Sequence, residues 1–398
     1  MGDSTILQLR ENEMIETGKL SPGQAQLLNR EYGRYLVVNP SWEPGLYQIT
    51  AKQYIGTIVL DDLRVLIQPK VPIENLFYML TYAYKLARFR DQESLLAGGD
   101  DLFEFIVLIF VKQVEQLVRH GIYRSYIDYE DNQRFLRGRL ILSQHLQRNV
   151  VQAHRFFQRT NEFTPDVIEN QILKYALWQL SRLNYDDANL RIRLRRSLSA
   201  FSEVSLSDIS VADCDRVIYN RLNLSYETQI QLAKLLLQHL SVEGHAGQNT
   251  FATYLLPMYQ VFEVFVANYL AAYFSEHNSF ALDIKPEIWL DMDQKERGEP
   301  DLVLTRDGRP YMVLDTKYKI FSGAPSQSDR NQMFMYCHTL GLSQGTLIYA
   351  GKQNDDYQRH FKGVTVEAMS LSLADNLSVF QSRCQEFAER FTESLAGL

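Results

Sequence analysis

The sequence lacks a long apolar run, and this lack limits the classes of protein to which it can belong. Its longest uninterrupted stretch of aliphatic and aromatic residues spans residues 105–111, far short of the roughly 20 residues that a helix needs to cross a bilayer. The first residues, MGDSTILQLRENE, also lack the basic-then-apolar order of a secretory signal. We therefore expect a cytoplasmic protein with no membrane partner.

Cysteine is scarce, and recognisable zinc and nucleotide motifs are missing. The three cysteines, Cys214, Cys337 and Cys384, form no CxxC pair, so we expect buried free thiols in a reducing compartment. The eight histidines show no metal-ligand spacing, which argues against a structural zinc site. No GxxxxGK[ST] loop is present, so we expect no nucleotide site in this chain.

Positive charge is also in short supply. The chain of 398 residues has a net charge of −7, and residues 251–398 carry 13 Lys and Arg against 19 Asp and Glu. Attraction to phosphates normally supplies most non-specific binding to DNA. If this acidic region acts on nucleic acid, it therefore needs metal ions and a partner to hold its substrate.

The composition is otherwise that of a folded protein, 45% hydrophobic and 22% charged, and its length suits two or three domains. Residues 1–72 have the short apolar runs and turn residues of a β-rich domain, in which Trp42 and Tyr47 are expected to pack. Residues 73–245 are mainly helical in pattern, and residues 244–250 are the best linker candidate. Residues 246–398 alternate helix and strand, as an α/β core does. The expected fold is thus a multidomain protein of mixed α/β and α+β class.

Residues 298–318 contain the most informative pattern, two short apolar strands joined by a turn at Asp307-Gly308. A three-residue loop would place Asp301 opposite Asp315, because the numbers of paired residues then sum to 616. A two-residue turn would instead pair Asp301 with Leu314 and separate the carboxylates. The chemistry of the hairpin therefore favours the longer loop or a compensating β-bulge.

The residues of this hairpin suit phosphodiester hydrolysis, which needs hard oxygen ligands for Mg²⁺, an activated water and stabilisation of developing charge. Asp301, Asp315 and the backbone carbonyl of Thr316 are candidate metal ligands. Lys317 is a candidate to orient or activate the water and to stabilise charge. The alternative is a surface hairpin with a solvated Asp–Lys pair.

Two flanking residues complete the candidate catalytic group. Glu263 lies at the border of the apolar stripe of an amphipathic helix over residues 258–274, and it is a candidate third metal ligand. Gln332 begins a later helix and could bring its amide near the water or the phosphate. The alternatives are an ordinary carboxylate at a helix border and an ordinary helical amide.

The hairpin matches the PD-(D/E)xK nuclease pattern, as Pro300-Asp301 followed by Asp315-Thr316-Lys317. More of the chain resembles one family. The segments QVFEVFVANYL, PDLVL, VLDTKYK and SDRNQMFMYCHTLG, and upstream IQPKVPIENLFYMLTYAY and RFLRGRLILSQHLQRN, are similar to McrC, the cleavage subunit of McrBC-type modification-dependent restriction systems.

This resemblance implies a restriction-endonuclease-like C-terminal core and a Mg²⁺-dependent endonuclease, with Mn²⁺ as a substitute, that cuts double-stranded DNA in antiphage defence. It also implies a hetero-oligomeric complex with an McrB-like AAA+ GTPase, contacted mainly through residues 1–160, whose GTP hydrolysis the chain stimulates. The metal-site residues of the family map onto Asp301, Asp315 and Lys317, and further onto Glu263 and Gln332. Thr316 departs from the usual Ala, but its side chain is expected to face away from the metal.

A basic stretch over residues 134–159 has two readings. It contains no acidic residue and interleaves phenylalanines, as a surface that contacts DNA or a partner does. It also fits a solvated basic face balanced by Glu130, Asp131 and Glu162. Its arginines are Arg134, Arg137, Arg139, Arg148, Arg155 and Arg159.

Two rival functions stay open at this point. The chain could be a non-catalytic adapter that activates an AAA+ motor, or a stand-alone PD-(D/E)xK nuclease of DNA repair or recombination. Mg²⁺-dependent nicking by the purified complex separates the first rival from a nuclease subunit. A neighbouring AAA+ GTPase gene would favour the restriction subunit, and its absence would favour the stand-alone nuclease.

Overall fold

The computed structural model describes residues 5–60, 62–84, 102–152, 154–185, 187–242, 252–277, 280–291, 293–351 and 356–396. The chain divides into two compact units, one formed by residues 1–102 with 253–398 and the other by residues 103–252. The first unit therefore combines the two ends of the chain. We refer to them as unit 1 and unit 2.

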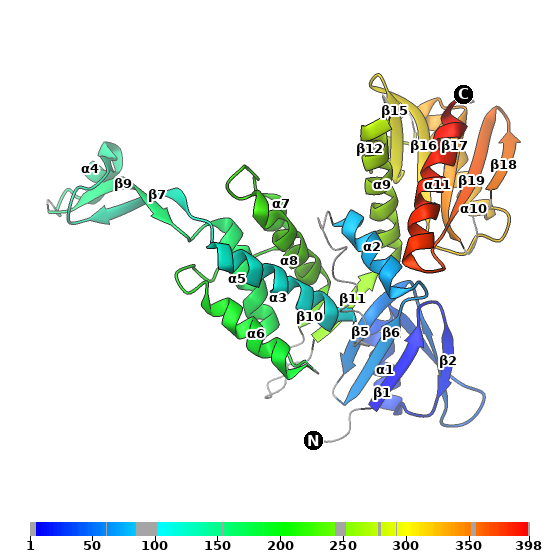
Figure 1. Cartoon of the computed structure of the whole chain (residues 1–398), viewed down its shortest axis with the longest axis horizontal. Helices are drawn as coiled ribbons and strands as arrows, with labels where there is room; N and C mark the ends of the chain where they lie inside the picture. Colours follow the sequence, from blue (N-terminus) through cyan, green and yellow to red (C-terminus); the bar gives the residue numbers. More distant parts are fainter. Residues whose placement is uncertain are drawn as a thin grey trace. The chain divides into compact units, whose positions relative to one another are not determined.

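The N-terminal part of unit 1 is rich in strands, as expected (Figure 1). Strands β1, β6, β5 and β11 form one sheet in that order, and β2, β4 and β3 form a second. The elements are β1 (Thr5–Arg10), β2 (Met14–Thr17), α1 (Pro22–Tyr32), β3 (Leu36–Pro40), β4 (Tyr47–Ala51), β5 (Tyr54–Leu60), β6 (Leu63–Gln68), α2 (Ile73–Ala83) and β11 (Ala252–Pro257).

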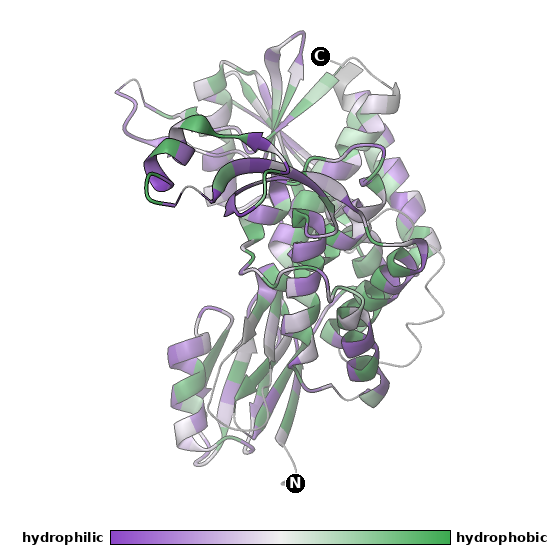
Figure 2. Ribbon diagram, turned by 90° about the vertical axis from the view of Figure 1, so that its left-hand side faces the viewer, coloured by the Kyte–Doolittle hydropathy of each residue, from purple (hydrophilic) through white to green (hydrophobic). Residues whose placement is uncertain are grey.

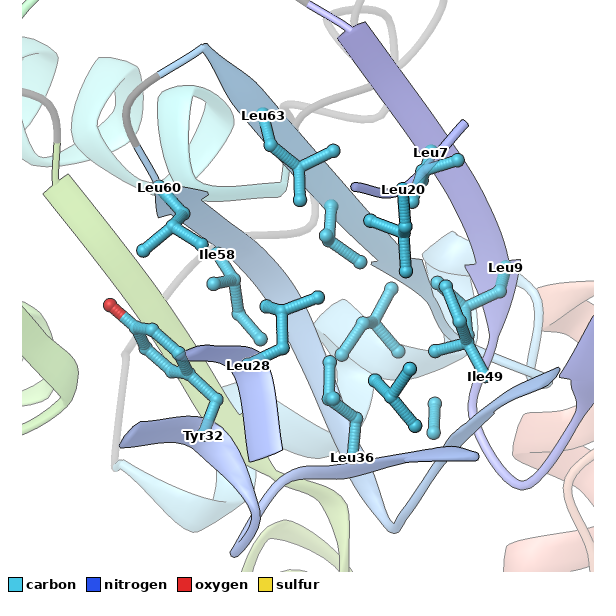
Figure 3. Packing of buried hydrophobic residues seen from close by; sticks show 14 of the residues in the cluster. Leu7, Leu9, Leu20, Leu28, Tyr32, Leu36, Ile49, Ile58, Leu60 and Leu63 are labelled. Carbon is cyan, nitrogen blue, oxygen red and sulfur yellow. The ribbon is translucent and has the colours of Figure 1, made fainter. Parts of the chain in front are cut away.

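The alternation of apolar and polar residues explains this core. In β6 every second residue, Leu63, Val65 and Ile67, is buried, since side chains alternate faces along a strand. Figure 3 shows Leu63 within a cluster of aliphatic side chains that also contains Leu28 of α1. Burial of this apolar surface is the main force that holds the strands and α1 together.

One packing prediction in this region is wrong. Trp42 lies in the loop between β3 and β4, and it is 98% exposed. The loop turns through Gly45, which has a positive φ of 86°, and Trp42 lies outside the regular strands whose alternation buries side chains. Tyr47, in β4, is partly buried against the core as expected.

The C-terminal part of unit 1 is a six-stranded mixed sheet in the order β12-β15-β16-β17-β19-β18, with helices packed against it (Figure 1). Strands β16, β17 and β19 run parallel to one another. The elements are α9 (Met258–His277), β12 (Phe280–Ile284), β13 (Ile288–Trp289), β14 (Arg297–Gly298), β15 (Leu302–Arg306), β16 (Arg309–Lys317), α10 (Gln327–Leu340), β17 (Gln344–Gly351), β18 (Asp356–Phe361), β19 (Val364–Ser372) and α11 (Leu377–Ala396).

Helix α2 joins the two parts of unit 1. The sequence places it in the helical middle region, but it packs on α9 and α11, where Tyr78 contacts Phe265 and Phe380 edge to face. Asn75, which is fully buried, donates hydrogen bonds to the carbonyls of Leu373 and Asp375. By its contacts α2 therefore belongs with the C-terminal sheet. The three-domain division stays a prediction, and its linker lies outside the described residues.

Unit 2 consists of a helical body and a strand-rich extension, which we call the arm (residues 125–164). Figure 1 shows the arm reaching away from the helices of this unit, and in Figure 2 its strands are mostly hydrophilic. Within it, β7, β9 and β8 pair in that order. The elements are α3 (Leu102–His120), β7 (Ser125–Gln133), β8 (Arg139–Leu140), α4 (Leu142–Arg148), β9 (Phe156–Thr164), α5 (Ile168–Ser181), α6 (Ala188–Ser199), α7 (Val211–Asp215), the 3-10 helix η2 (Leu224–Tyr226), α8 (Glu227–His239) and β10 (Leu240–Val242).

Two absences expected from the sequence can be checked on the described residues. All three cysteines are buried free thiols. Among the helices of the described ranges, none is long and apolar enough to cross a membrane.

Candidate active site

The hairpin of β15 and β16 combines the two registers that the sequence left open. Asp307 and Gly308 both have positive φ, 52° and 74°, which is the backbone of a two-residue type I′ turn. A β-bulge between Leu304 and Thr305 then shifts the register, so that Leu302 pairs with Leu314 and Val303 with Val313. The paired numbers beyond the bulge sum to 616, so the predicted compensating bulge is confirmed.

Asp301 lies one residue before this paired segment, at the N-terminal end of β15. Its Oδ2 accepts hydrogen bonds from the backbone N–H and the hydroxyl of Thr316, both at 2.6 Å. The prediction that the Thr316 side chain faces away from the site is therefore wrong. Because Asp301 precedes the regular strand, its side chain reaches across to Thr316, and the hydroxyl supplies a second bond that an alanine would lack.

Asp315 is the most perturbed carboxyl group of the hairpin. It is 3% exposed, and burial together with the charge of Asp301 raises its pKa to about 6 despite the neighbouring Lys317. Lys317 forms an ion pair with Asp315. Burial lowers the pKa of Lys317, but the charges of Asp315, Asp301 and Asp329 outweigh it and leave that pKa raised. The ammonium group of Lys317 thus interacts electrostatically with several carboxylates.

Gln332 of α10 lies beside this lysine. Lys317 Nζ donates to Gln332 Oε1 at 3.0 Å, and Gln332 Nε2 donates to the Tyr336 hydroxyl at 2.9 Å. Gly345 of β17 permits this approach, because a Cβ there would come within 2.3 Å of Met333 Sδ. The structure therefore brings Gln332 to the hairpin, as the sequence suggested.

Glu263 of α9 approaches from another side. Its carboxylate pairs with Lys285 Nζ at 2.7 Å, and burial is the main cause of its raised pKa, to which Asp301 also contributes. Sequence reasoning missed Lys285. It has a positive φ of 50°, and its backbone N–H donates to the carbonyl of Asp301 at 2.9 Å. No sequence motif signals a lysine whose role depends on this unusual backbone conformation.

Asp329 of α10 is a second residue that the sequence did not reveal. It is 5% exposed, accepts a hydrogen bond from the Tyr349 hydroxyl at 2.7 Å, and pairs with Lys319 at 2.6 Å. Its charge contributes to the raised pKa of Asp315. The signal that could have found it is its place in the first turn of a helix capped by Ser326.

The site as a whole carries an excess of negative charge. Its carboxyl groups, which interact electrostatically with one another, outnumber the lysines that accompany them by five to three. The carboxylates are Glu263, Glu299, Asp301, Asp315 and Asp329, and the lysines are Lys285, Lys317 and Lys319.

The donor set suits a hard cation, because carboxylate oxygens are the ligands that Mg²⁺ prefers. Across the described part of the chain, however, no three His, Cys, Asp or Glu side chains are already arranged as metal ligands. The reason is visible in the contacts: Glu263 is held by Lys285, and Asp301 by Thr316. Asp315 is likewise paired with Lys317, so each of these carboxylates already has a partner within the protein.

The N-terminal part of unit 1 contacts the C-terminal end of β16. Tyr318, which follows Lys317, donates its hydroxyl proton to Glu11 Oε1 at 2.6 Å, and its carbonyl accepts from Gln53 Nε2 at 2.7 Å. Glu11 is fully buried, and burial raises its pKa. On another side Tyr318 borders a cavity of about 250 Å³ that Lys70 also lines. The hydrogen bonds to Glu11 and Gln53 thus tie the residue after Lys317 to the N-terminal part of unit 1.

The six arginines singled out in the sequence lie in the arm of unit 2. Three have partners there: Arg159 pairs with Glu130 at 2.5 Å, Arg155 donates to the carbonyl of Asn132, and Arg148 lies over the Phe157 ring. Within the described ranges the other three, Arg134, Arg137 and Arg139, form no ion pair. The arm thus contains arginines with partners and arginines that form no ion pair among the described residues.

Comparison with known proteins identifies relatives. A family model described as "McrBC 5-methylcytosine restriction system component" matches residues 49–350. The Escherichia coli (strain K12) protein "Type IV methyl-directed restriction enzyme EcoKMcrBC" is 27% identical over 149 residues, which are 35% of this chain and 41% of that relative. The match thus spans less than half the length of this curated relative.

A solved structure shares the fold. It is a chain of a half-complex from a tetradecameric assembly of Thermococcus gammatolerans McrB AAA+ hexamers with bound McrC. The TM-score is 0.60 at 18% sequence identity, over 96% of this chain and 99% of that chain. At this identity the similarity concerns the fold alone.

Proposed function

This chain belongs to the family of McrBC 5-methylcytosine restriction system components, and from that membership we propose that it is the DNA-cleaving subunit of such a system. The observation that carries the proposal is the buried Asp315, whose pKa is raised by burial and by Asp301 and which pairs with Lys317 at the end of a hairpin. A buried carboxyl whose pKa is shifted by burial and by a specific charged neighbour is a functional-site candidate. The C-terminal sheet would then be a PD-(D/E)xK nuclease core.

In this proposal Mg²⁺, or Mn²⁺ in its place, would be held by Asp301, Asp315 and the backbone carbonyl of Thr316. Glu263, which pairs with Lys285 at 2.7 Å, would be a third carboxylate ligand. When bound, the metal would polarise the phosphate and lower the pKa of a water. The net excess of two carboxylates over lysines in the site matches the charge of one divalent cation.

The remaining residues act on the water and the phosphate. Lys317 Nζ holds the attacking water in position and offsets the negative charge that develops on the phosphate oxygens. Gln332, hydrogen-bonded to Lys317 at 3.0 Å, keeps that ammonium group directed into the site. Asp301, by accepting two hydrogen bonds from Thr316, fixes the strand end on which Lys317 sits.

The chain would work in the cytoplasm within a hetero-oligomer that contains an McrB-like AAA+ GTPase. The fold relative from Thermococcus gammatolerans is bound to McrB AAA+ hexamers, and no GxxxxGK[ST] loop occurs in this sequence. Residues 1–160, and in particular the unpaired Arg134, Arg137 and Arg139 of the arm, are the proposed contacts with that partner or with double-stranded DNA. The partner would supply recognition of the modified base and translocation.

A cleavage assay tests the proposal. The chain, its AAA+ partner and GTP are incubated with methylated duplex DNA in Mg²⁺ or in EDTA. We expect cleavage in Mg²⁺ only, and a loss of at least about a thousandfold for Asp315→Asn, because metal-dependent charge stabilisation contributes several kcal/mol. Asp307→Asn removes a charge from the exposed turn of the same hairpin and should cut like wild type.

The same assay separates the rival functions. Stimulation of GTP hydrolysis by a complex that never nicks DNA in Mg²⁺ would favour the non-catalytic adapter. Cleavage by the chain alone, without partner or GTP, would favour a stand-alone nuclease of repair or recombination. Cleavage of DNA by the Asp315→Asn variant at the wild-type rate would refute the site assignment. The family membership would not be affected.

A further inference from the structure

Unit 2 differs in charge from the rest of the chain. Residues 103–252 contain 18 Lys and Arg against 16 Asp and Glu, a net charge of +2 in a chain of net charge −7. The arm accounts for this net charge, with 6 Lys and Arg against 4 Asp and Glu, while the remainder of unit 2 carries 12 of each sign. Positive charge is nevertheless concentrated locally on one helix. Helix α6 contains four arginines in six residues and no acidic residue, with the sequence ANLRIRLRRSLS.

Among the described residues, Arg193 is the one arginine of these four that forms an ion pair. Arg193 forms a bidentate pair with Glu115 of α3, with Nε to Oε1 at 2.9 Å and Nη2 to Oε2 at 2.7 Å. Both side chains are partly buried, which favours a firm pair. This contact ties α6 to α3, so the remaining arginines project from a fixed surface.

Other basic groups gather around the same carboxylate. The pKa of Glu115 is lowered, chiefly by its hydrogen bond from Arg193 and further by the charges of Arg119 and Arg196. The pKa of Lys112, one turn before Glu115 on α3, is lowered by burial and by the charge of Arg193. Four basic side chains thus share one acid.

Two further arginines face solvent. Arg191 and Arg195 are exposed, and among the described residues neither forms an ion pair or a side-chain hydrogen bond. With 100° per residue, the exposed arc of α6 runs through Arg191, Arg195 and Arg196, opposite the buried Leu190 and Leu194, and it also contains Ile192, which is 64% exposed. Like charges four residues apart destabilise a helix by about 0.2–0.5 kcal/mol. Folding therefore gains nothing from this arrangement.

We propose that Arg191, Arg195 and Arg196, the α6 basic face, bind the sugar–phosphate backbone of DNA. Arginine forks match phosphate oxygens and carry the sequence-independent part of DNA affinity. A polyanion also offsets the mutual repulsion of the arginines. The inference deepens the proposed function, since it names where that substrate's backbone is held.

The test uses the full chain and an unmethylated, fluorescently labelled DNA duplex in EDTA, so that no cleavage occurs. Anisotropy titrations at several KCl concentrations compare wild type with the double variant Arg191→Gln/Arg195→Gln. We expect about tenfold weaker binding at moderate salt and a salt slope smaller by about 2, one for each phosphate contact removed. The unfolding midpoint should stay the same or rise, because like charges have been removed.

A matched control carries the same change in net charge within unit 2. Arg216→Gln/Arg221→Gln removes two exposed arginines outside the face, so it should leave the affinity and the salt slope near wild type. Equal losses in both variants would mean a general charge effect and would overturn the proposal. So would unchanged DNA binding by Arg191→Gln/Arg195→Gln together with lost binding of the AAA+ partner, since an acidic protein would then be the ligand.

This outcome is independent of the nuclease proposal. DNA binding in EDTA needs no catalytic residue, so a chain that cuts nothing but loses affinity in the α6 variant supports the basic face alone. A chain that cuts DNA normally, with affinity and salt slope unaffected by the α6 substitutions, refutes the face and leaves the cleavage site standing.

Discussion

The two units of the chain handle charge in opposite ways. Unit 1 gathers carboxylates at the end of a buried sheet, where Asp315 is 3% exposed and shares Lys317 with other acids. Unit 2 exposes arginines on α6 and in the arm. Carboxylates inside and arginines outside suit different tasks, holding a cation and attracting a polyanion. The net charge of −7 conceals this separation, because it averages the two.

The largest effect on stability is expected from Asp315 in unit 1. Its pKa is raised from 3.8 to about 6, so the folded state keeps a proton that the unfolded state releases. Below about pH 4 both states are protonated, and the stability conferred by this proton is lost as the pH rises from about 4 to 6. A shift of this size corresponds to about 2–3 kcal/mol.

The measurement is the free energy of unfolding of wild type and Asp315→Asn in EDTA, between pH 4 and 7. The variant should be the more stable at pH 7, and the difference should shrink towards pH 4. Other carboxyl groups titrate in the same range, but they are common to both proteins. A difference in stability that does not change with pH would mean that the pKa of Asp315 is not raised in the folded state. The proposed contrast between buried carboxylates in unit 1 and exposed arginines in unit 2 would then be weaker.

A smaller effect is expected where the N-terminal part of unit 1 contacts the C-terminal end of β16. Glu11→Leu leaves the Tyr318 hydroxyl without its acceptor, which should cost about 1–3 kcal/mol of stability. Released towards the neighbouring cavity, Tyr318 should also let Lys317 move, and we expect cleavage to fall about tenfold, as misplacement of a catalytic group does.

Glu11→Gln is the matched control, because its amide oxygen can still accept the Tyr318 hydroxyl while the buried charge is removed. It should cut like wild type. Hydrogen exchange at the amides of residues 316–319 gives a readout that does not depend on cleavage, and it should speed up in Glu11→Leu only. Equal exchange rates in both variants would mean that Glu11 stabilises the N-terminal sheets without holding residues 316–319 in place.

The smallest effect belongs to the arm of unit 2. Arg159→Ala breaks the ion pair with Glu130, in which both side chains are about half exposed. Exposed pairs of this kind contribute about 0–1 kcal/mol, so the unfolding midpoint should hardly change. A loss as large as that predicted for Glu11→Leu would contradict the view that the charges of unit 2 are placed for binding and not for folding.

The sequence predicted the hairpin well, because its chemistry constrained its geometry. Two carboxylates that must meet require an odd register, an Asp-Gly pair dictates a two-residue turn, and only a bulge reconciles them. The helix that contains Glu263 was also predicted, since its apolar stripe is long and regular.

The residues that sequence reasoning missed depend on contacts distant in the chain. Lys285 reaches Glu263 through a positive φ that no motif encodes. Thr316 turned out to contact Asp301, because Asp301 lies just outside the regular strand, where alternation of faces no longer applies. The arginines of α6 are visible in the sequence, but Glu115, the acid that pairs with Arg193, lies 78 residues away from it. Trp42 was predicted to pack in the core, but it is exposed, because the hydrophobicity of a residue does not reveal the geometry of the loop that contains it.

Binding of Mn²⁺ to the full chain, followed by the electron paramagnetic resonance signal of the free ion, tests most directly whether the carboxylates of unit 1 hold a divalent cation. Wild type and the turn variant Asp307→Asn should bind the ion with equal affinity. Asp301→Asn and Asp315→Asn should each weaken binding at least about tenfold, since each removes a charged oxygen ligand. Equal affinity in all four proteins would contradict the account.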